Sequence, residues 1–195
     1  MDVVRMLEAA SLLVPAGVAT STDITACDVW DHLAHDEWEV ALGLLQELGG
    51  GWTAPPGFWD ELELAAGMLG FARSRAWCSW RGAETREGVI RAELFLRPAG
   101  ETFRRTPVPG AGVLRPMWDI GNRTDGGARE LDIARLWVEC AGDLAPGAQA
   151  PVRLLPLTAA RWRHLRPGDR ITLYETAVAG GTATVLEVHP PSALA

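Results

Sequence analysis

The sequence predicts an α+β protein with segregated elements, an N-terminal helical domain followed by a C-terminal antiparallel β-barrel. Apolar residues recur at helical spacing up to about residue 80, and after residue 88 they alternate with polar ones. Charge divides at the same place. Residues 1–80 carry three arginines and twelve acids, a net of −9, whereas residues 81–195 carry fifteen arginines and thirteen acids, a net of +2. We therefore expect an acidic helical domain over 1–84, a barrel over 85–190 and a tail over 191–195.

Residues typical of helix ends indicate the limits of the first two helices. Residues 3–14 repeat apolar side chains at helical spacing and stop at Pro15. Thr25 opens a second helix, with Asp28 three positions on at the spacing of a capping box. Three residues are expected on the buried side of that helix: Trp30, Leu33 and Ala34.

The third helix has the clearest pattern in the chain. Residues 36–51 combine an apolar stripe with acids in the first turn and glycines at the end. Residues 58–81 are also helical in pattern, but Gly67 and Gly70 weaken the middle, so this segment forms either one kinked helix or two. The third helix buries this stripe: Trp38, Ala41, Leu42, Leu45 and Leu48.

Six short strands are expected in the second domain. Residues 89–97 alternate, and one face of that strand consists of Ile90, Ala92, Leu94 and Leu96. In the turns at 145–147 and 166–169, proline presets φ and glycine supplies the positive φ that follows. Short strands with such turns and no strong helix between them predict a closed or nearly closed barrel. The other candidates are 112–120, 134–140, 150–157, 170–175 and 181–188.

These segments, in this order, resemble the C-terminal β-barrel of elongation factor Tu and related translation GTPases. "IRAELFLRPAGETFRRTP" at 90–107 resembles the strand of that family that ends before a Gly-Arg-His-Thr-Pro turn, and "LRPMWDI" at 114–120 resembles its Tyr-Arg-Pro-Gln-Phe-Tyr strand. "APGA" at 145–148 is similar to its Met-Pro-Gly-Asp turn, and "RITLYETA" at 170–177 to its Arg-Phe-Ala-Ile-Arg-Glu-Gly-Gly hairpin. The likeness covers about residues 88–188.

The resemblance implies a barrel of the translation-factor type and, as in the family, a surface that contacts the T-stem of aminoacyl-tRNA and protein partners. It does not imply GTPase activity, because the chain has no G-x-x-x-x-G-K-[ST] segment and no lysine at all. Arg104 matches the phosphate-facing arginine of the family, and Arg105 stands where a histidine is usual. Residues 176–178 replace the second arginine and both glycines of the hairpin.

The candidate ligand-binding residues are therefore Arg104, Arg105 and Arg115, with Glu175 nearby. One hypothesis is that the arginines bind phosphate or an acidic partner. The other is that they form ion pairs within the chain, with Glu93, Glu101 or the acidic helical domain.

Other motifs weigh against catalysis. His32 and His35, flanked by acids, have a helical spacing that suits either a metal site or a solvated acidic face. The sequence contains no nucleophile elbow, no Cys-His-Asp order and no pair of carboxylates at strand ends. We expect no catalytic residue, cofactor or metal. Among the nine tryptophans, Trp52 follows three glycines and is the best candidate for an exposed recognition residue.

The function predicted is that of a cytoplasmic, non-catalytic binding protein without a membrane span, with a protein partner or, alternatively, RNA such as tRNA. A competing hypothesis assigns the function to the helical half. The segment "DHLAHDEWEVALGLLQEL" at 31–48 is similar to helices of small bacterial immunity proteins, so the acidic half would neutralise a basic toxin or regulate a basic partner.

Overall fold

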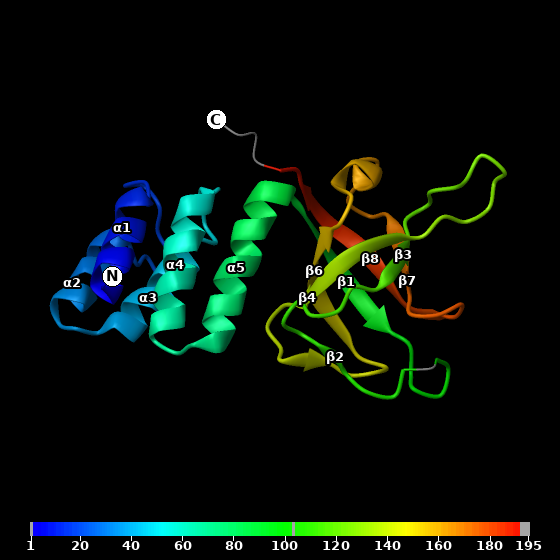
Figure 1. Ribbon diagram of the computed structural model, residues 1–195, viewed down its shortest axis with the longest axis horizontal. Helices are drawn as coiled ribbons and strands as arrows, with labels where there is room; N and C mark the ends of the chain where they lie inside the picture. Colours follow the sequence, from blue (N-terminus) through cyan, green and yellow to red (C-terminus); the bar gives the residue numbers. More distant parts are fainter. Residues whose placement is uncertain (1, 103, 192–195) are drawn as a thin grey trace. The chain divides into compact units, whose positions relative to one another are not determined.

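Two structural units make up the chain, and the computed structural model describes residues 2–102 and 104–191. The first unit, Met1–Arg86, consists of helices, and the second, Glu87–Ala195, is built on strands (Figure 1). The boundary after Arg86 lies two residues from the expected one after residue 84. Most of the tail expected at 191–195 lies outside the described residues.

The helices of the first unit begin and end at the local signals in the sequence. Thr25 and Asp28 form a capping box, in which the N–H of Thr25 donates to the Asp28 carboxylate at 2.7 Å. None of the helices in the described part of the chain is long and apolar enough to cross a membrane. Their bounds are α1 Val3–Leu13, α2 Ala26–Ala34, α3 Trp38–Leu48, α4 Pro56–Met68 and α5 Ala72–Glu87.

Two helices, rather than one kinked helix, cover residues 56–87. α4 ends at Met68 and α5 begins at Ala72. Gly70 lies between them with a φ of 78°, a left-handed conformation that glycine adopts easily and that an α-helix cannot continue through. The glycine that weakens the pattern in the sequence therefore ends a helix.

The core of the helical unit contains the stripes that helical spacing predicts, with one error in α2. Trp30 is 38% exposed and Ala34 is also exposed, whereas Val29 and Leu33 are buried. Val29 and Leu33 are four positions apart and share one face, and Trp30 points roughly 100° away from Val29 around the helix. The largest fully buried side chains of this unit are Leu7, Leu42, Leu45, Leu48, Phe58, Trp59, Leu62 and Trp80.

Gly49 follows α3 for a packing reason. Its φ is −61°, so a left-handed conformation is not what requires glycine here. A Cβ atom at Gly49 would lie 2.5 Å from the ring of Trp59 and 2.7 Å from the ring of Phe58. The absence of a side chain therefore lets two aromatic residues of α4 pack against the end of α3.

The second unit is the closed antiparallel barrel that the alternating pattern predicts. Its strands are hydrogen-bonded in the order β1-β6-β4-β3-β7-β8. A separate pair of two-residue strands, β2 (Val108–Pro109) and β5 (Asp143–Leu144), has no periodic signal and is missed by sequence reasoning. The barrel strands are β1 Val89–Leu96, β3 Met117–Asp119, β4 Asp132–Val138, β6 Gln149–Pro156, β7 Arg170–Tyr174 and β8 Ala179–His189.

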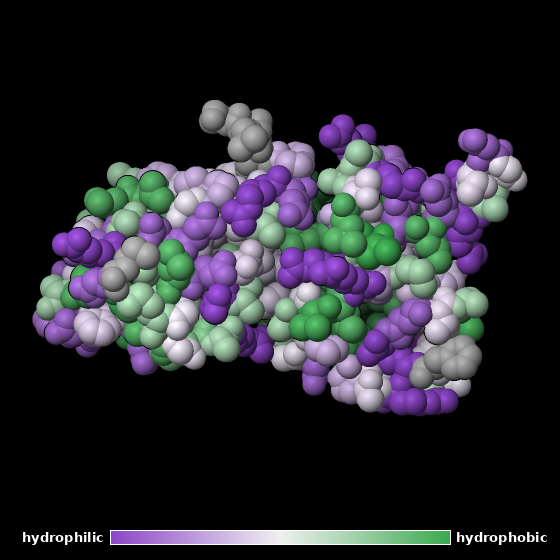
Figure 2. Space-filling model, viewed as in Figure 1, coloured by the Kyte–Doolittle hydropathy of each residue, from purple (hydrophilic) through white to green (hydrophobic). Residues whose placement is uncertain are grey.

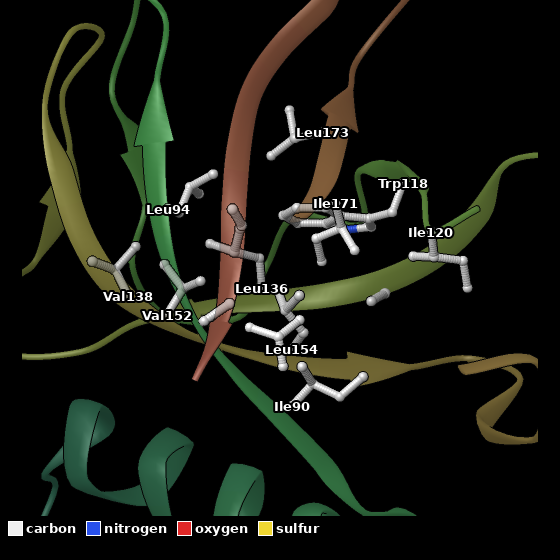
Figure 3. Close-up of a cluster of buried hydrophobic side chains, with 14 of the residues drawn as sticks. Ile90, Leu94, Trp118, Ile120, Leu136, Val138, Val152, Leu154, Ile171 and Leu173 are labelled. Carbon is white, nitrogen blue, oxygen red and sulfur yellow. The ribbon is translucent and has the colours of Figure 1, made fainter. Parts of the chain in front are cut away.

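Alternate side chains fill the barrel. In β1 the four residues expected inside are at most 3% exposed, whereas Phe95 between them is 42% exposed. Trp118 of β3 is fully buried, and its indole lies beside Ile171 of β7 inside the barrel (Figure 3). The core therefore depends on residues far apart in the sequence.

Only part of the strand expected at 112–120 forms, because β3 begins at Met117. Residues 110–116 run beside β4 with scattered hydrogen bonds, such as that from the N–H of Leu136 to the carbonyl of Leu114 at 3.2 Å. Pro116 has no N–H to donate, which interrupts the ladder just before Met117.

Candidate functional site

The predicted site residues gather at one end of the barrel, which we call the arginine end. β1 finishes there at Leu96, opposite Gly181 near the start of β8. Met117 of β3 lies opposite Tyr174 of β7, so the residues just before β3 and just after β7 share this end. The register thus brings Arg104, Arg105 and Arg115 to the end of the barrel where Glu175 lies.

Arg104 is held by its surroundings. Its Nε donates to Oε1 of Glu175 at 2.6 Å, and a terminal guanidinium nitrogen pairs with the same carboxylate. The other terminal nitrogen donates to the carbonyls of Thr106 and Pro107, each at 3.2 Å. The side chains of Arg104 and Glu175 are 15% and 23% exposed. The structure therefore places Arg104 in an internal ion pair that fixes its loop to the β7–β8 hairpin.

Arg105 and Arg115 are placed differently. Both are exposed, and neither guanidinium group forms an ion pair or hydrogen bond with any described residue. Val113, between β2 and β3, is 70% exposed, the highest value among the large hydrophobic residues of the barrel unit that the structure describes. A guanidinium with its donors free can bind a carboxylate or phosphate in a bidentate manner. The arginine end thus presents two available cations and an exposed apolar side chain.

Replacing Arg104 by alanine should destabilise the barrel by about 1–3 kcal/mol, because Glu175 would be left partly buried without its cation. Equilibrium unfolding and hydrogen exchange of residues 98–107 would measure the loss. Arg105→Ala is the matched control, since it removes the same side chain from an exposed neighbouring position and should change stability by no more than about 0.5 kcal/mol. Equal effects of the two changes would contradict the assigned role of Arg104.

The histidines of α2 do not converge on a metal site. Nδ1 of His32 pairs with Glu37 at 2.6 Å, and Nδ1 of His35 donates to the carbonyl of Asp31 at 2.7 Å. Within residues 2–102 and 104–191, no three His, Cys, Asp or Glu residues are grouped so that they could hold a metal ion. These side chains cap and brace the end of α2.

Trp52 is not an exposed recognition residue. It is half-buried against the helical core, and its ring meets that of Phe58 edge-on with centroids 5.8 Å apart. The glycines before it provide a turn that returns the chain to the core. The exposed tryptophan of α2 is Trp30 instead.

Cys78 is buried in the helical core and is not available as a nucleophile. Burial raises the pKa of its thiol to about 11, although a hydrogen bond from Gln46 at 3.1 Å acts in the opposite direction. The thiol is therefore protonated at neutral pH.

Thiol titration of the native protein should separate the buried Cys78 from the other two cysteines. Cys27 and Cys140 should react quickly with an aromatic disulfide reagent, because both are exposed. Cys78 should react at least about a hundred times more slowly, and at full rate only in denaturant. Three equally fast thiols in the native protein would contradict the burial of Cys78.

A charge network that sequence reasoning missed lies on the outer face of the barrel. Arg91 of β1 donates two hydrogen bonds to the carboxylate of Glu139, at 2.8 and 2.9 Å, and Arg153 of β6 donates a third at 3.0 Å. Arg91 also pairs with Glu187 of β8 at 2.7 Å. Although burial acts to raise it, these arginines hold the pKa of Glu139 below its usual 4.5. The network is structural, since its cations are already paired.

No protein-family model matches the chain, and no curated protein sequence matches it significantly.

Proposed function

We propose that the chain is a non-catalytic binding protein whose barrel, of the type found at the C-terminus of elongation factor Tu-like translation factors, holds an acidic protein partner at the arginine end. The order of short motifs between residues 88 and 188 supports the family assignment. The closed six-stranded antiparallel barrel is consistent with it. The absence of lysine from the chain excludes a P-loop lysine, so GTPase activity is not part of the proposal.

The observation that carries this proposal is the contrast between neighbouring arginines. Arg104 is fixed by Glu175, while Arg105 and Arg115 keep their guanidinium groups free among the described residues. A loop anchored in this way loses little conformational entropy on binding, and arginine is enriched in protein interfaces. A local net charge of only +2 over residues 81–195 favours a protein partner over RNA, which usually requires a more basic surface.

Capture from cell extract tests the proposal, with the full chain as bait. The charge reversal Arg105→Glu plus Arg115→Glu should abolish capture of an acidic protein without lowering the melting temperature. The control variant Arg5→Glu plus Arg170→Glu makes the same charge change at exposed positions outside the arginine end and should retain the partner. Capture that is lost after nuclease treatment would replace the protein partner with RNA. Equal loss in both variants would overturn the site.

A second candidate function rests on the acidic surface around α2 and α3. Asp31, Asp36 and Glu39 are exposed there, and two exposed apolar side chains, Trp30 and Val40, lie among them in the sequence. Such a surface suits a basic partner, as in the neutralisation of a toxin. Reversing Asp31, Asp36 and Glu39 to arginine would abolish capture of a basic protein if this candidate is correct, and leave the acidic partner unaffected if the first proposal holds.

A further inference from the structure

A cavity of about 610 Å³ opens at the end of the barrel that lies opposite to the arginine end. Its walls come from residues 87–90 at the start of β1, from the end of β6, the short helix η1 (Ala159–Trp162) and the loop after it, and from residues 188–191 at the end of β8. All of its described lining residues belong to the barrel unit. In Figure 1, η1 is the short gold helix, drawn without a label, at this end of the barrel. The volume falls within the range of about 300–1,000 Å³ that is typical of small-molecule sites.

The cavity combines an apolar wall with cations. Ile90 and Leu165 line it and are 3% and 2% exposed, and Val89 and Val188 add further apolar surface. On the face of the barrel unit seen in Figure 2, hydrophobic residues gather below η1 and hydrophilic residues surround them. The ionisable residues in the described lining are Glu87, Arg163, Arg166 and His189.

Two guanidinium groups in the lining have donors to spare. Arg163 is exposed, and its guanidinium has no partner among the described residues. Arg166 uses one terminal nitrogen to donate to the carbonyls of Arg163 and Leu165, at 3.2 and 3.1 Å, which leaves its other nitrogens for a ligand. His189 is already paired with Glu187 at 2.8 Å. Anion binding here would therefore depend on the two arginines.

Trp162 supplies an independent observation. It lines the cavity and is 2% exposed, yet its indole N–H has no acceptor among the described residues. A buried N–H without a partner is unfavourable, so an acceptor at this position would be stabilised. The nitrogen of this N–H is itself shielded from solvent, so a ligand oxygen near Arg163 would become its acceptor after a small rotation of the indole.

The wall that carries these donors is already fixed. Arg161 of η1 pairs with the buried carboxylate of Asp132 and with Glu130 at 2.9 Å. His164 donates from Nε2 to the carbonyl of Ile120 at 2.8 Å. A ligand would therefore not have to order η1.

We propose that this cavity binds a small organic acid, an apolar body that carries one carboxylate. The body would occupy the apolar wall, and the carboxylate would lie between Arg163, Arg166 and the Trp162 N–H. A monoanion fits better than a phosphate dianion, because Glu87 in the same lining repels additional negative charge. This site is separate from the arginine end and does not depend on the function proposed for it.

The test is titration of the ¹⁵N-labelled full chain with 4-phenylbutyrate, followed through the indole N–H signals of the nine tryptophans. Trp162→Phe assigns the Trp162 signal. That signal should move downfield as it gains an acceptor and should saturate at millimolar ligand or below. The neutral amide 4-phenylbutyramide has the same body without the charge, and it should bind at least tenfold more weakly.

Arg163→Gln should weaken 4-phenylbutyrate binding about tenfold with an unchanged melting temperature, because this exposed side chain supports no described contact. Arg123→Gln, which removes a charge paired with Asp119, is the control and should bind normally. The proposal is overturned if the Trp162 signal stays in place up to saturating probe. It is equally overturned if the amide binds as well as the acid.

Discussion

Replacing Trp118 by alanine is expected to lower the free energy of unfolding of the barrel unit by about 3–5 kcal/mol. Trp118 is fully buried and comes from β3, a strand of only three residues. Two residue pairs join β3 to β4 and three join it to β7. With so few backbone pairs, closure of the barrel at β3 depends on the packing of this indole against residues such as Ile171 (Figure 3).

The loss of stability in Trp118→Ala should come from packing alone, because the indole N–H of Trp118 has no acceptor among the described residues. Trp118→Phe keeps most of the apolar volume and should therefore cost only about 1–2 kcal/mol. Hydrogen exchange of the amides in β3, β4 and β7 measures the effect within the barrel, separately from the helical unit. Trp30→Ala, at a 38% exposed position, is the control and should leave barrel exchange unchanged. A Trp118→Ala barrel with wild-type protection would refute this account.

The fold was predictable because its main signals are local. Alternation in residues 89–96 identifies which side chains of β1 face inward, and the Thr25–Asp28 spacing identifies where α2 begins. The errors arise where burial depends on distant neighbours. Val29 and Trp30 both lie at helical spacing from Leu33, and only packing against the rest of the helical core decides that Val29 is the buried one. Likewise, the two-residue strands β2 and β5 form only because the folded chain brings them together.

The site was less predictable because charge pairing is not local. Arg104 and Arg105 are identical neighbours in sequence, yet only Arg104 meets Glu175, 71 positions away. The resemblance to a known hairpin, rather than any spacing, indicates that Glu175 lies near these arginines. The cavity at η1 has no sequence signature, since its described lining comes from three separate stretches of the chain, 87–90, 156–167 and 188–191.

Replacing Glu139 by glutamine is expected to cost about 2–4 kcal/mol of barrel stability, between the values for exposed and fully buried ion pairs. Arg91 and Arg153 are paired directly across β1 and β6, so two like charges face each other there. The carboxylate of Glu139, which is 14% exposed, accepts hydrogen bonds from both. Glutamine keeps the shape but removes the charge that separates the two guanidinium groups. Glu101→Gln, at an exposed position, is the matched control.

The pH dependence of the stability difference between wild type and Glu139→Gln tests whether Glu139 acts as a carboxylate. The pKa of Glu139 is lower in the folded protein than its usual 4.5, so its contribution to stability is fully present above that pH. As pH falls below about 4.5, Glu139 is protonated first in the unfolded chain. Its contribution to stability then decreases progressively and is gone once the carboxylate of the folded protein is protonated as well. The stability difference between wild type and Glu139→Gln should therefore be constant from pH 7 to 5 and shrink below pH 4.5. Urea unfolding monitored through the barrel amides measures it at each pH, and a difference that grows in acid would show that Glu139 does not stabilise the barrel as a carboxylate.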